Sequence, residues 1–184
     1  LMNGKSTDNL IQLRDNFRNN AEELKKLRKN YGQNKNKINK LENKNEEIAK
    51  NITKNIISTI KNNLPNGLQD LQSKIYADKD GYADVLGEIF TKNVKTNQLR
   101  RFFDAMKQIE SKLFAQRRDW KDIENEFYLL KPKLAFAKGR KLIPDIFYDL
   151  IMACMGKTNS KEDFKVLVQF FEAIVAYHRY YGGE

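Results

Sequence analysis

The sequence predicts an all-α protein: a compact helical bundle of about five to six helices, preceded by an amphipathic, coiled-coil-like helical extension. Apolar residues recur at spacings of three and four along most of the 184-residue chain, which is the period of a helix with one buried face. No stretch shows the alternation of apolar and polar residues that is typical of a strand. Proline and glycine fall between the periodic segments, where they end helices.

Residues 1–66 form the predicted extension, which is basic and rich in Asn and Lys. Asp8 can cap a first helix, whose apolar positions are Leu10, Leu13, Phe17, Ala21, Leu24 and Leu27. The pattern breaks near Gly32 and then resumes with Ile38, Leu41, Ile48, Ile52, Ile56 and Ile60. Asn45 stands where an apolar residue is expected, and residues 64–67 (LPNG) end the second helix. We therefore predict an antiparallel helical hairpin or a paired coil, not one long rod.

Residues 67–184 form the predicted compact domain. A short helix at residues 68–75 should end before Asp80 and Gly81, and an amphipathic helix should cover residues 82–90. Thr96 can cap the next helix. Its predicted buried positions are Leu99, Phe102, Phe103, Met106, Ile109 and Leu113.

A proline and a glycine divide the middle of this domain. A helix predicted from Asp119 should bend at Pro132, because proline removes a backbone donor and clashes with the preceding turn. Gly139 should then end the helical segment in the left-handed conformation, which costs glycine nothing.

Two further helices complete the prediction. Pro144 suits the first turn of one that ends at Gly156. Ser160 and Asp163 form a capping-box pattern for the last helix. Its buried face is predicted to contain Phe164, Leu167, Phe171, Ile174, His178 and Tyr181.

The charge favours a polyanionic partner. The chain has 34 Lys and Arg against 24 Asp and Glu, a net charge of +10, and its pI is about 9.5. Residues 1–66 hold 14 Lys and Arg and 7 Asp and Glu, so +7 of this charge lies there and +3 in the remainder. This imbalance indicates RNA binding by the first third, but Asn, Lys and Ile are also what an AT-rich genome would encode.

Two groups of cations are candidates for phosphate contacts. One is the segment KPKLAFAKGR, with four cations at Lys131, Lys133, Lys138 and Arg140. The helix dipole explains a single cation near a helix C-terminus more readily than it explains four. The other is Arg100 with Arg101, in the first turns of a helix, where free N–H groups and the dipole favour a phosphate. Such contacts give affinity without reading sequence.

Catalytic and metal sites are not predicted. His178 is the only histidine and continues a buried helix face, while Cys154 lies in an apolar run and is better explained as a buried thiol than as a nucleophile. The acidic run at residues 78–84 lacks the glutamate of a calcium loop and has Tyr82 at a ligand position. No glycine-rich phosphate loop is present. We therefore expect no enzyme activity, no cofactor and no metal ion.

The single cysteine and the hydropathy bear on location. One cysteine allows no intrachain disulfide, and no apolar stretch reaches the roughly 18 to 20 residues of a membrane span. We therefore expect a cytoplasmic protein that has no membrane partner.

Three sequence blocks resemble a known family. They are TNQLRRF at residues 96–102, LKPKLAFAKGR from Leu130 and FFEAIVAYH from Phe170. In this order they resemble the small helical subunit of type III-A CRISPR effector complexes, the Csm family, over about residues 68–181. The resemblance implies a non-catalytic, all-helical subunit that stacks in several copies beside the crRNA and target RNA. Cleavage would then belong to other subunits of the complex.

The resemblance also implies which residues contact the RNA backbone: Gln98, Arg100, Arg101, Lys133, Lys138 and Arg140. Phe136 stands where the family has a tyrosine, so a hydroxyl contact is not implied there. Residues 1–66 lie outside the resemblance. Besides RNA and the other effector subunits, a second copy of the chain is an expected partner, as a homodimer in isolation. The alternative function is a helical self-associating scaffold or protein-docking module without direct nucleic-acid binding.

Overall fold

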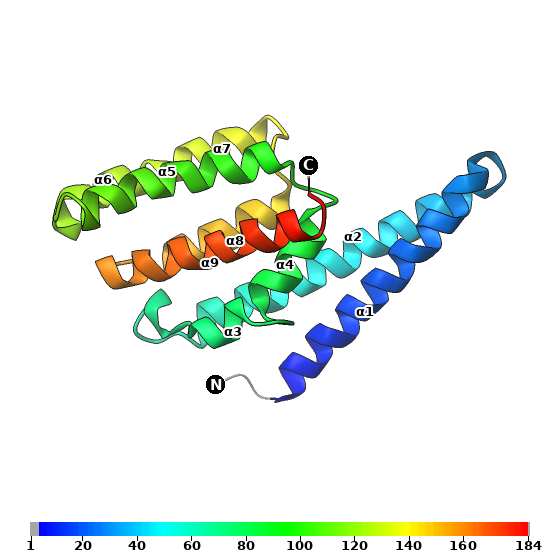
Figure 1. The fold of residues 1–184 in the computed structure, drawn as a ribbon, viewed down its shortest axis with the longest axis horizontal. Coiled ribbons are helices and arrows are strands. Elements are labelled where there is room, and N and C mark those ends of the chain that lie inside the picture. Colours follow the sequence, from blue (N-terminus) through cyan, green and yellow to red (C-terminus); the bar gives the residue numbers. More distant parts are fainter. Residues whose placement is uncertain (1–3, 184) are drawn as a thin grey trace. The chain divides into compact units, whose positions relative to one another are not determined.

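The computed structural model describes residues 4–183 and consists, in that range, of helices joined by turns, without a strand (Figure 1). The predicted all-α fold class is therefore confirmed. The chain divides into two compact units, of which one ends at Ile56 and the other begins at Ile57. The predicted division into residues 1–66 and 67–184 stays a prediction.

A helical hairpin forms the first unit. It consists of α1 (Gly4–Leu27), the short 3-10 helix η1 (Arg28–Asn30) and α2 (Tyr31–Asn62), whose last residues belong to the second unit. α1 and α2 run side by side in opposite directions (Figure 1), which confirms the predicted antiparallel hairpin. The predicted cap at Asp8 is wrong, because α1 already begins at Gly4 and each residue added to a helix gains a further hydrogen bond.

Asn45, which interrupts the apolar face of α2, is buried with an exposed fraction of 8%. Its side-chain oxygen accepts a hydrogen bond of 2.8 Å from Asn20 Nδ2, and its Nδ2 donates to the carbonyl oxygen of Phe17 at 3.2 Å. The buried amide is therefore satisfied from α1, and a buried polar pair of this kind fixes the register of two paired helices.

The second unit continues with η2 (Leu68–Asp70), α3 (Ser73–Ala77), α4 (Tyr82–Phe90), α5 (Thr96–Phe114), α6 (Trp120–Tyr128), α7 (Leu130–Gly139), α8 (Asp145–Gly156) and α9 (Lys161–Tyr180). α9 is its central helix and packs against η2, α3, α4 and α5 (Figure 1). α6 packs against α5 and α7, and α7 also packs against α8.

Aromatic side chains join these helices in the core. The Phe171 ring lies 5.4 Å from that of Phe102, 6.3 Å from that of Phe147 and 5.9 Å from that of Phe170, measured between ring centroids. All three pairs are edge-to-face, a geometry that adds to the stabilisation from burial alone. α5, α8 and α9 therefore share one aromatic core.

Asp163 ties the start of α9 to η2. Ser160 caps α9 as predicted, because its side chain accepts a hydrogen bond of 3.1 Å from the Asp163 N–H. The buried Asp163 carboxylate accepts from the N–H of Gln69 at 2.8 Å and from the N–H of Asn159 at 3.0 Å. Gly67 passes so close that a Cβ there would lie 2.4 Å from the carboxylate, and its φ of 122° is open to glycine.

Two predicted helix starts are corrected. Residues 68–75 are not one helix. The Gln69 N–H donates to the Asp163 carboxylate, and the backbone of Gln72 is extended between η2 and α3, with φ −65° and ψ 138°. Thr96 does not cap α5, because Lys95 is the N-cap and its carbonyl accepts from the N–H groups of Gln98 and Leu99.

The predicted bend at Pro132 is a break between α6 and α7 at Leu129. α6 ends at Tyr128, which is the residue four before Pro132, the position where a proline removes the hydrogen bond and clashes with the carbonyl. Pro132 itself falls in the first turn of α7, where no intrahelical donor is needed.

Gly139 ends α7, but the predicted left-handed conformation occurs at Lys141, with a φ of 55°. The N–H of Lys141 donates to Lys138 at 2.8 Å, and that of Leu142 donates to Ala137 at 2.9 Å, which is the hydrogen-bond pattern of a Schellman motif. Pro144 is the N-cap of α8, one residue before the predicted first turn.

Candidate nucleic-acid interface

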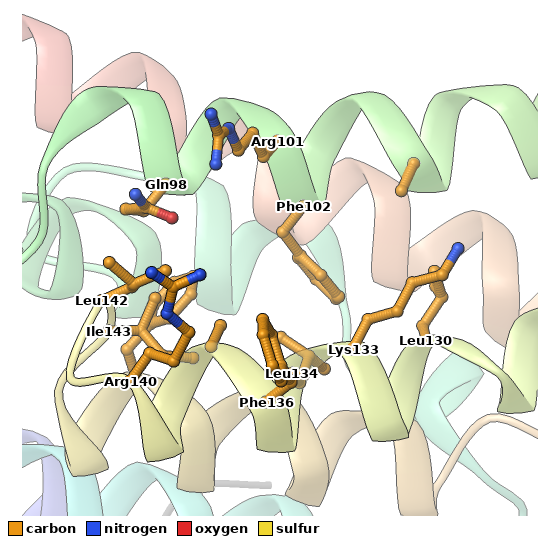
Figure 2. A pocket seen from close by; sticks show the side chains of 13 residues that line it. Gln98, Arg101, Phe102, Leu130, Lys133, Leu134, Phe136, Arg140, Leu142 and Ile143 are labelled. Carbon is orange, nitrogen blue, oxygen red and sulfur yellow. The ribbon is translucent and has the colours of Figure 1, made fainter.

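A pocket of about 300 Å³ lies between α5, α7 and the start of α8. Figure 2 shows its lining, with Gln98 and Arg101 on α5 and the Arg140 side chain extending from the end of α7 toward Gln98. Lys133 is the fourth polar residue of the pocket lining. The other nine lining residues are apolar: Phe102, Ala105, Leu130, Leu134, Phe136, Ala137, Leu142, Ile143 and Phe147.

A second pocket of about 320 Å³ adjoins the first and shares Ala105, Leu130 and Lys133 with it. We call the two pockets together the α5–α7 groove. Its one carboxylate, Glu126, belongs to the second pocket, and both of its oxygens lie 2.7 Å from Lys112 Nζ. The groove therefore offers no free carboxylate to its own cations.

Arg101, Lys133 and Arg140 are exposed, and none of them forms an ion pair with any residue that the structure describes. The first pocket is lined by these three cations and by no acidic residue. Three cations that line one apolar hollow raise the local positive potential, because low-dielectric walls focus the field. The geometry therefore suits an anionic ligand.

Phe136 adds an aromatic surface to the groove. Its side chain is 64% exposed, and the Arg140 guanidinium carbon lies 5.5 Å from the centroid of its ring. An aromatic side chain of this size is normally buried. Leu142, which is 40% exposed, lies on the same pocket.

The other two predicted contact residues do not line the groove. Arg100 is exposed elsewhere on α5. Lys138 Nζ lies 3.2 Å from Asp145 and 3.8 Å from Asp149, and 4.4 Å from the centroid of the Tyr148 ring. The hydrogen bond to Asp145 raises the pKa of Lys138. The structure thus brings four of the six predicted residues together and gives Lys138 acidic neighbours on α8.

His178 and Cys154 occupy the buried positions that the sequence predicts. His178 Nε2 lies 3.1 Å from the carbonyl oxygen of Val94, and burial is the main reason that the pKa of His178 is lowered. Burial raises the pKa of the Cys154 thiol well above its ordinary value, so the reactive thiolate is disfavoured.

Within residues 4–183, no three His, Cys, Asp or Glu side chains gather closely enough to hold a metal ion. In the same range, every helix is too short or too polar to cross a bilayer.

The family model described as Csm2 Type III-A matches residues 73–184. The chain belongs to this family. As the three sequence blocks predicted, it is a small subunit of the type III-A Csm complex. No curated protein and no solved structure gave a significant match. The match to Csm2 includes all of α5 and α7, and therefore the groove, but it leaves out α1 and α2.

The apolar floor of the groove was not predicted as part of the site. Leu130 and Leu134 repeat at a spacing of four and indicate a buried helix face, whereas Phe136 lies off that spacing. An aromatic residue off the buried face and among cations, as Phe136 is, is the feature of the sequence that indicates this apolar surface.

Proposed function

We propose that this Csm2-family subunit binds the phosphate backbones of crRNA and target RNA along the α5–α7 groove. The observation that carries the proposal is the set of three cations, Arg101, Lys133 and Arg140, which line one pocket without an acidic partner among the described residues. In this proposal the subunit is non-catalytic, lies in the cytoplasm and stacks in several copies beside the RNA.

The groove combines the chemistry that an RNA strand needs. Guanidinium groups bond two phosphate oxygens at once, and Arg101 and Arg140 supply two of them. The Gln98 amide can donate to a phosphate or a ribose hydroxyl. Phe136 can stack against a base or ribose without selecting its identity. Binding of this kind gives affinity with weak sequence preference.

Arg100 and Lys138 belong to the proposal as outer contacts. Arg100 is exposed on α5 and needs no rearrangement to meet a phosphate beyond the groove. Lys138 must first exchange Asp145 and Asp149 for the phosphate, so the net gain from this lysine is smaller.

A second candidate function is docking of another protein into the groove. Nine of the thirteen residues that line the first pocket are apolar, and Phe136 and Leu142 remain 64% and 40% exposed. Exposed apolar surface of this kind also marks protein interfaces. Membership of the Csm2 family already implies association with other subunits of the complex.

A salt titration of RNA binding separates the two functions. Arg101 and Arg140 are replaced together by Ala, and the matched control replaces Lys121 and Lys165, two exposed lysines outside the groove, which removes the same charge. Each phosphate contact on a single strand contributes about 0.7 to the slope of log K against log salt. We expect the slope to become less steep by about 1.4 for the groove variant and affinity to fall by about 1.5 to 3 kcal/mol in total, on the order of one charged hydrogen bond.

The titration is made with the free protein and with the reconstituted complex, using two RNAs of unrelated sequence. Both RNAs should lose affinity by similar factors. If circular dichroism shows a native fold while the groove variant and the control keep the same slope, the groove does not hold RNA and protein docking becomes the better explanation.

A further inference from the structure

The end of the hairpin carries the densest charge in the chain outside the matched region. We define the hairpin tip as residues 25–40, which include the last residues of α1, η1 and the first turns of α2. Seven Lys and Arg fall within it, and residues 25–41 contain no Asp or Glu. The tip lies wholly outside residues 73–184 and so outside the Csm2 match.

Two of the seven cations form ion pairs with acidic residues that lie within two positions of the tip in the sequence. Arg28 lies 2.6 Å from Glu42, and Lys37 lies 2.8 Å from Glu23. The other five are exposed and form no ion pair with any described residue: Lys25, Lys26, Lys29, Lys35 and Lys40. Folding therefore gathers unpaired positive charge at one end of the first unit.

The spacing of these charges is short compared with the distance over which salt screens them. Lys35, Lys37 and Lys40 are two and three residues apart on α2, which is a rise of about 3 and 4.5 Å. The screening length is about 8 Å at physiological ionic strength. Neighbouring cations therefore repel one another at the tip, and a polyanion whose charges repeat every few ångströms relieves that repulsion and releases its own counterions.

The uncharged residues of the tip identify the class of polyanion. Asn30, Gln33, Asn36 and Asn39 are exposed and carry amide donors and acceptors. Tyr31, at 53%, is the one large apolar side chain of the tip that is exposed among the described residues. The exposed surface of the tip lacks the contiguous apolar patch that forms the core of many protein interfaces. Cations, amides and one exposed aromatic ring match a nucleic-acid strand instead.

We propose that the hairpin tip is a second nucleic-acid contact, separate from the α5–α7 groove, and that its ligand is the phosphate backbone of an RNA or DNA strand. It extends the area of the subunit that touches nucleic acid beyond the family-matched domain. The contact is independent of sequence, because phosphates carry no base information.

The test replaces Lys29 and Lys35 together by Gln in the full chain within the reconstituted complex. The matched control replaces Lys44 and Lys54, which are exposed on the same helix, lie in the same unit and remove the same charge outside the tip. Binding of a single-stranded RNA and of a DNA of the same sequence is titrated with salt.

We expect the tip variant to bind about tenfold more weakly, with a slope less steep by about 1.4, while the control stays near wild type. An equal loss for RNA and DNA identifies the phosphate alone as the ligand, and a loss confined to one identifies that strand. An unchanged slope for both strands overturns the proposal. The groove variant is measured separately, so a negative result at the tip leaves the groove unaffected.

A crosslink gives a second measurement that does not depend on affinity. A photoreactive amino acid at Gln33 in the tip should attach to nucleic acid in the assembled complex, and the same group at Asn51, exposed on α2 outside the tip, should not. Attachment of the Gln33 group to another protein subunit alone, or to nothing, contradicts the proposal.

Discussion

Arg140 is held in place before any ligand arrives. It is the C-cap of α7, and its N–H donates to the carbonyl oxygen of Phe136 at 3.1 Å while its guanidinium lies 5.5 Å from the Phe136 ring centroid. A cation positioned by its own backbone and by an aromatic face loses less rotamer freedom on binding than a free side chain. Replacement by lysine would keep the positive charge but remove the planar guanidinium, which can bind two phosphate oxygens at once.

The pKa of His178 tests whether its side chain is buried in the core, and a single titration measures it. Burial lowers its pKa, the hydrogen bonds to the carbonyls of Val94 and Phe90 oppose that shift, and nearby Arg179 lowers it further. The unfolded chain therefore takes up a proton at a higher pH than the folded protein does. Stability is then fully present above the unfolded pKa of about 6.5 and falls as the pH drops toward the folded pKa.

The measurement uses the single histidine of the sequence, whose Cε1 proton gives one NMR signal that follows the protonation of the ring. We expect a titration midpoint below about 6.5 in the folded protein. A midpoint at or above that value contradicts the prediction, and means either that the ring is solvated or that its hydrogen bonds to the carbonyls of Val94 and Phe90 outweigh the effect of burial.

Among helices, α7 shows why only some of the predicted cations meet. Lys133, Ala137 and Arg140 are spaced by four and three and so share one face of α7, whereas Lys138 falls on another face and meets α8. On α5, Gln98 and Arg101 are likewise three apart, and Arg100 falls outside that row.

Helical spacing accounts for the division of the six predicted residues into these two groups, but which of them converge was not predicted from the sequence. The position of α7 against α5 was not predictable in the same way, because it depends on the break at Leu129. Proline chemistry gives a reason for that break, but not the direction in which the chain leaves it. The acidic partners of Lys138 likewise come from α8 and become visible only once the helices pack.

α4 and α9 approach so closely that Gly87 has no room for a side chain. A Cβ there would lie 2.6 Å from Tyr177 Cβ and 2.8 Å from the backbone nitrogen of His178. We expect Gly87→Ala to lower the free energy of unfolding by about 2 kcal/mol, because overpacking forces the two helices apart. Denaturant unfolding followed by circular dichroism measures the change.

Gly156 is the matched control, because it also lies in a helix but a Cβ there meets nothing within 4 Å. Gly156→Ala should stabilise the protein by about 0.5 to 1 kcal/mol, since alanine is the better helix former. Equal effects of the two substitutions would mean that α4 and α9 are not in close contact at Gly87.

For the whole molecule, the net charge of +10 predicts opposite salt dependences for self-association and for RNA binding. Copies of the chain repel one another electrostatically, while exposed apolar side chains such as Leu129 and Tyr180, at 60% and 78%, favour contact. We predict that the isolated protein forms a dimer that strengthens as salt rises, because salt screens the repulsion. RNA binding should weaken over the same range.

Multi-angle light scattering at micromolar concentration in low and high salt measures the dimer. A mass that stays monomeric over a hundredfold range of concentration in both salts would exclude self-association through apolar faces. A dimer that dissociates with added salt would mean that ion pairs, not apolar contacts, hold the two copies together.

The architecture of the whole chain was predictable where local patterns agree with burial. The hairpin, the stop at Leu64–Gly67 and the capped start of α9 follow from periodicity, turn residues and the Ser160 cap. The errors occur where a distant group decides the local structure. Asp163 divides residues 68–75 by accepting a hydrogen bond from the Gln69 N–H, and a partner 94 positions away is not visible in the local pattern. The left-handed residue after α7 is Lys141, not the glycine that propensity favours.

The hydrogen bond between Gln69 and Asp163 also sets an order of events during synthesis. η2, α3, α4 and α5 all pack against α9, which follows every other helix in the described chain, so the second unit cannot close until α9 has left the ribosome. The hairpin is joined by contacts such as Asn20 to Asn45, only 25 positions apart, and is complete much earlier. A nascent chain therefore presents a folded, positively charged hairpin tip while the matched domain is still open.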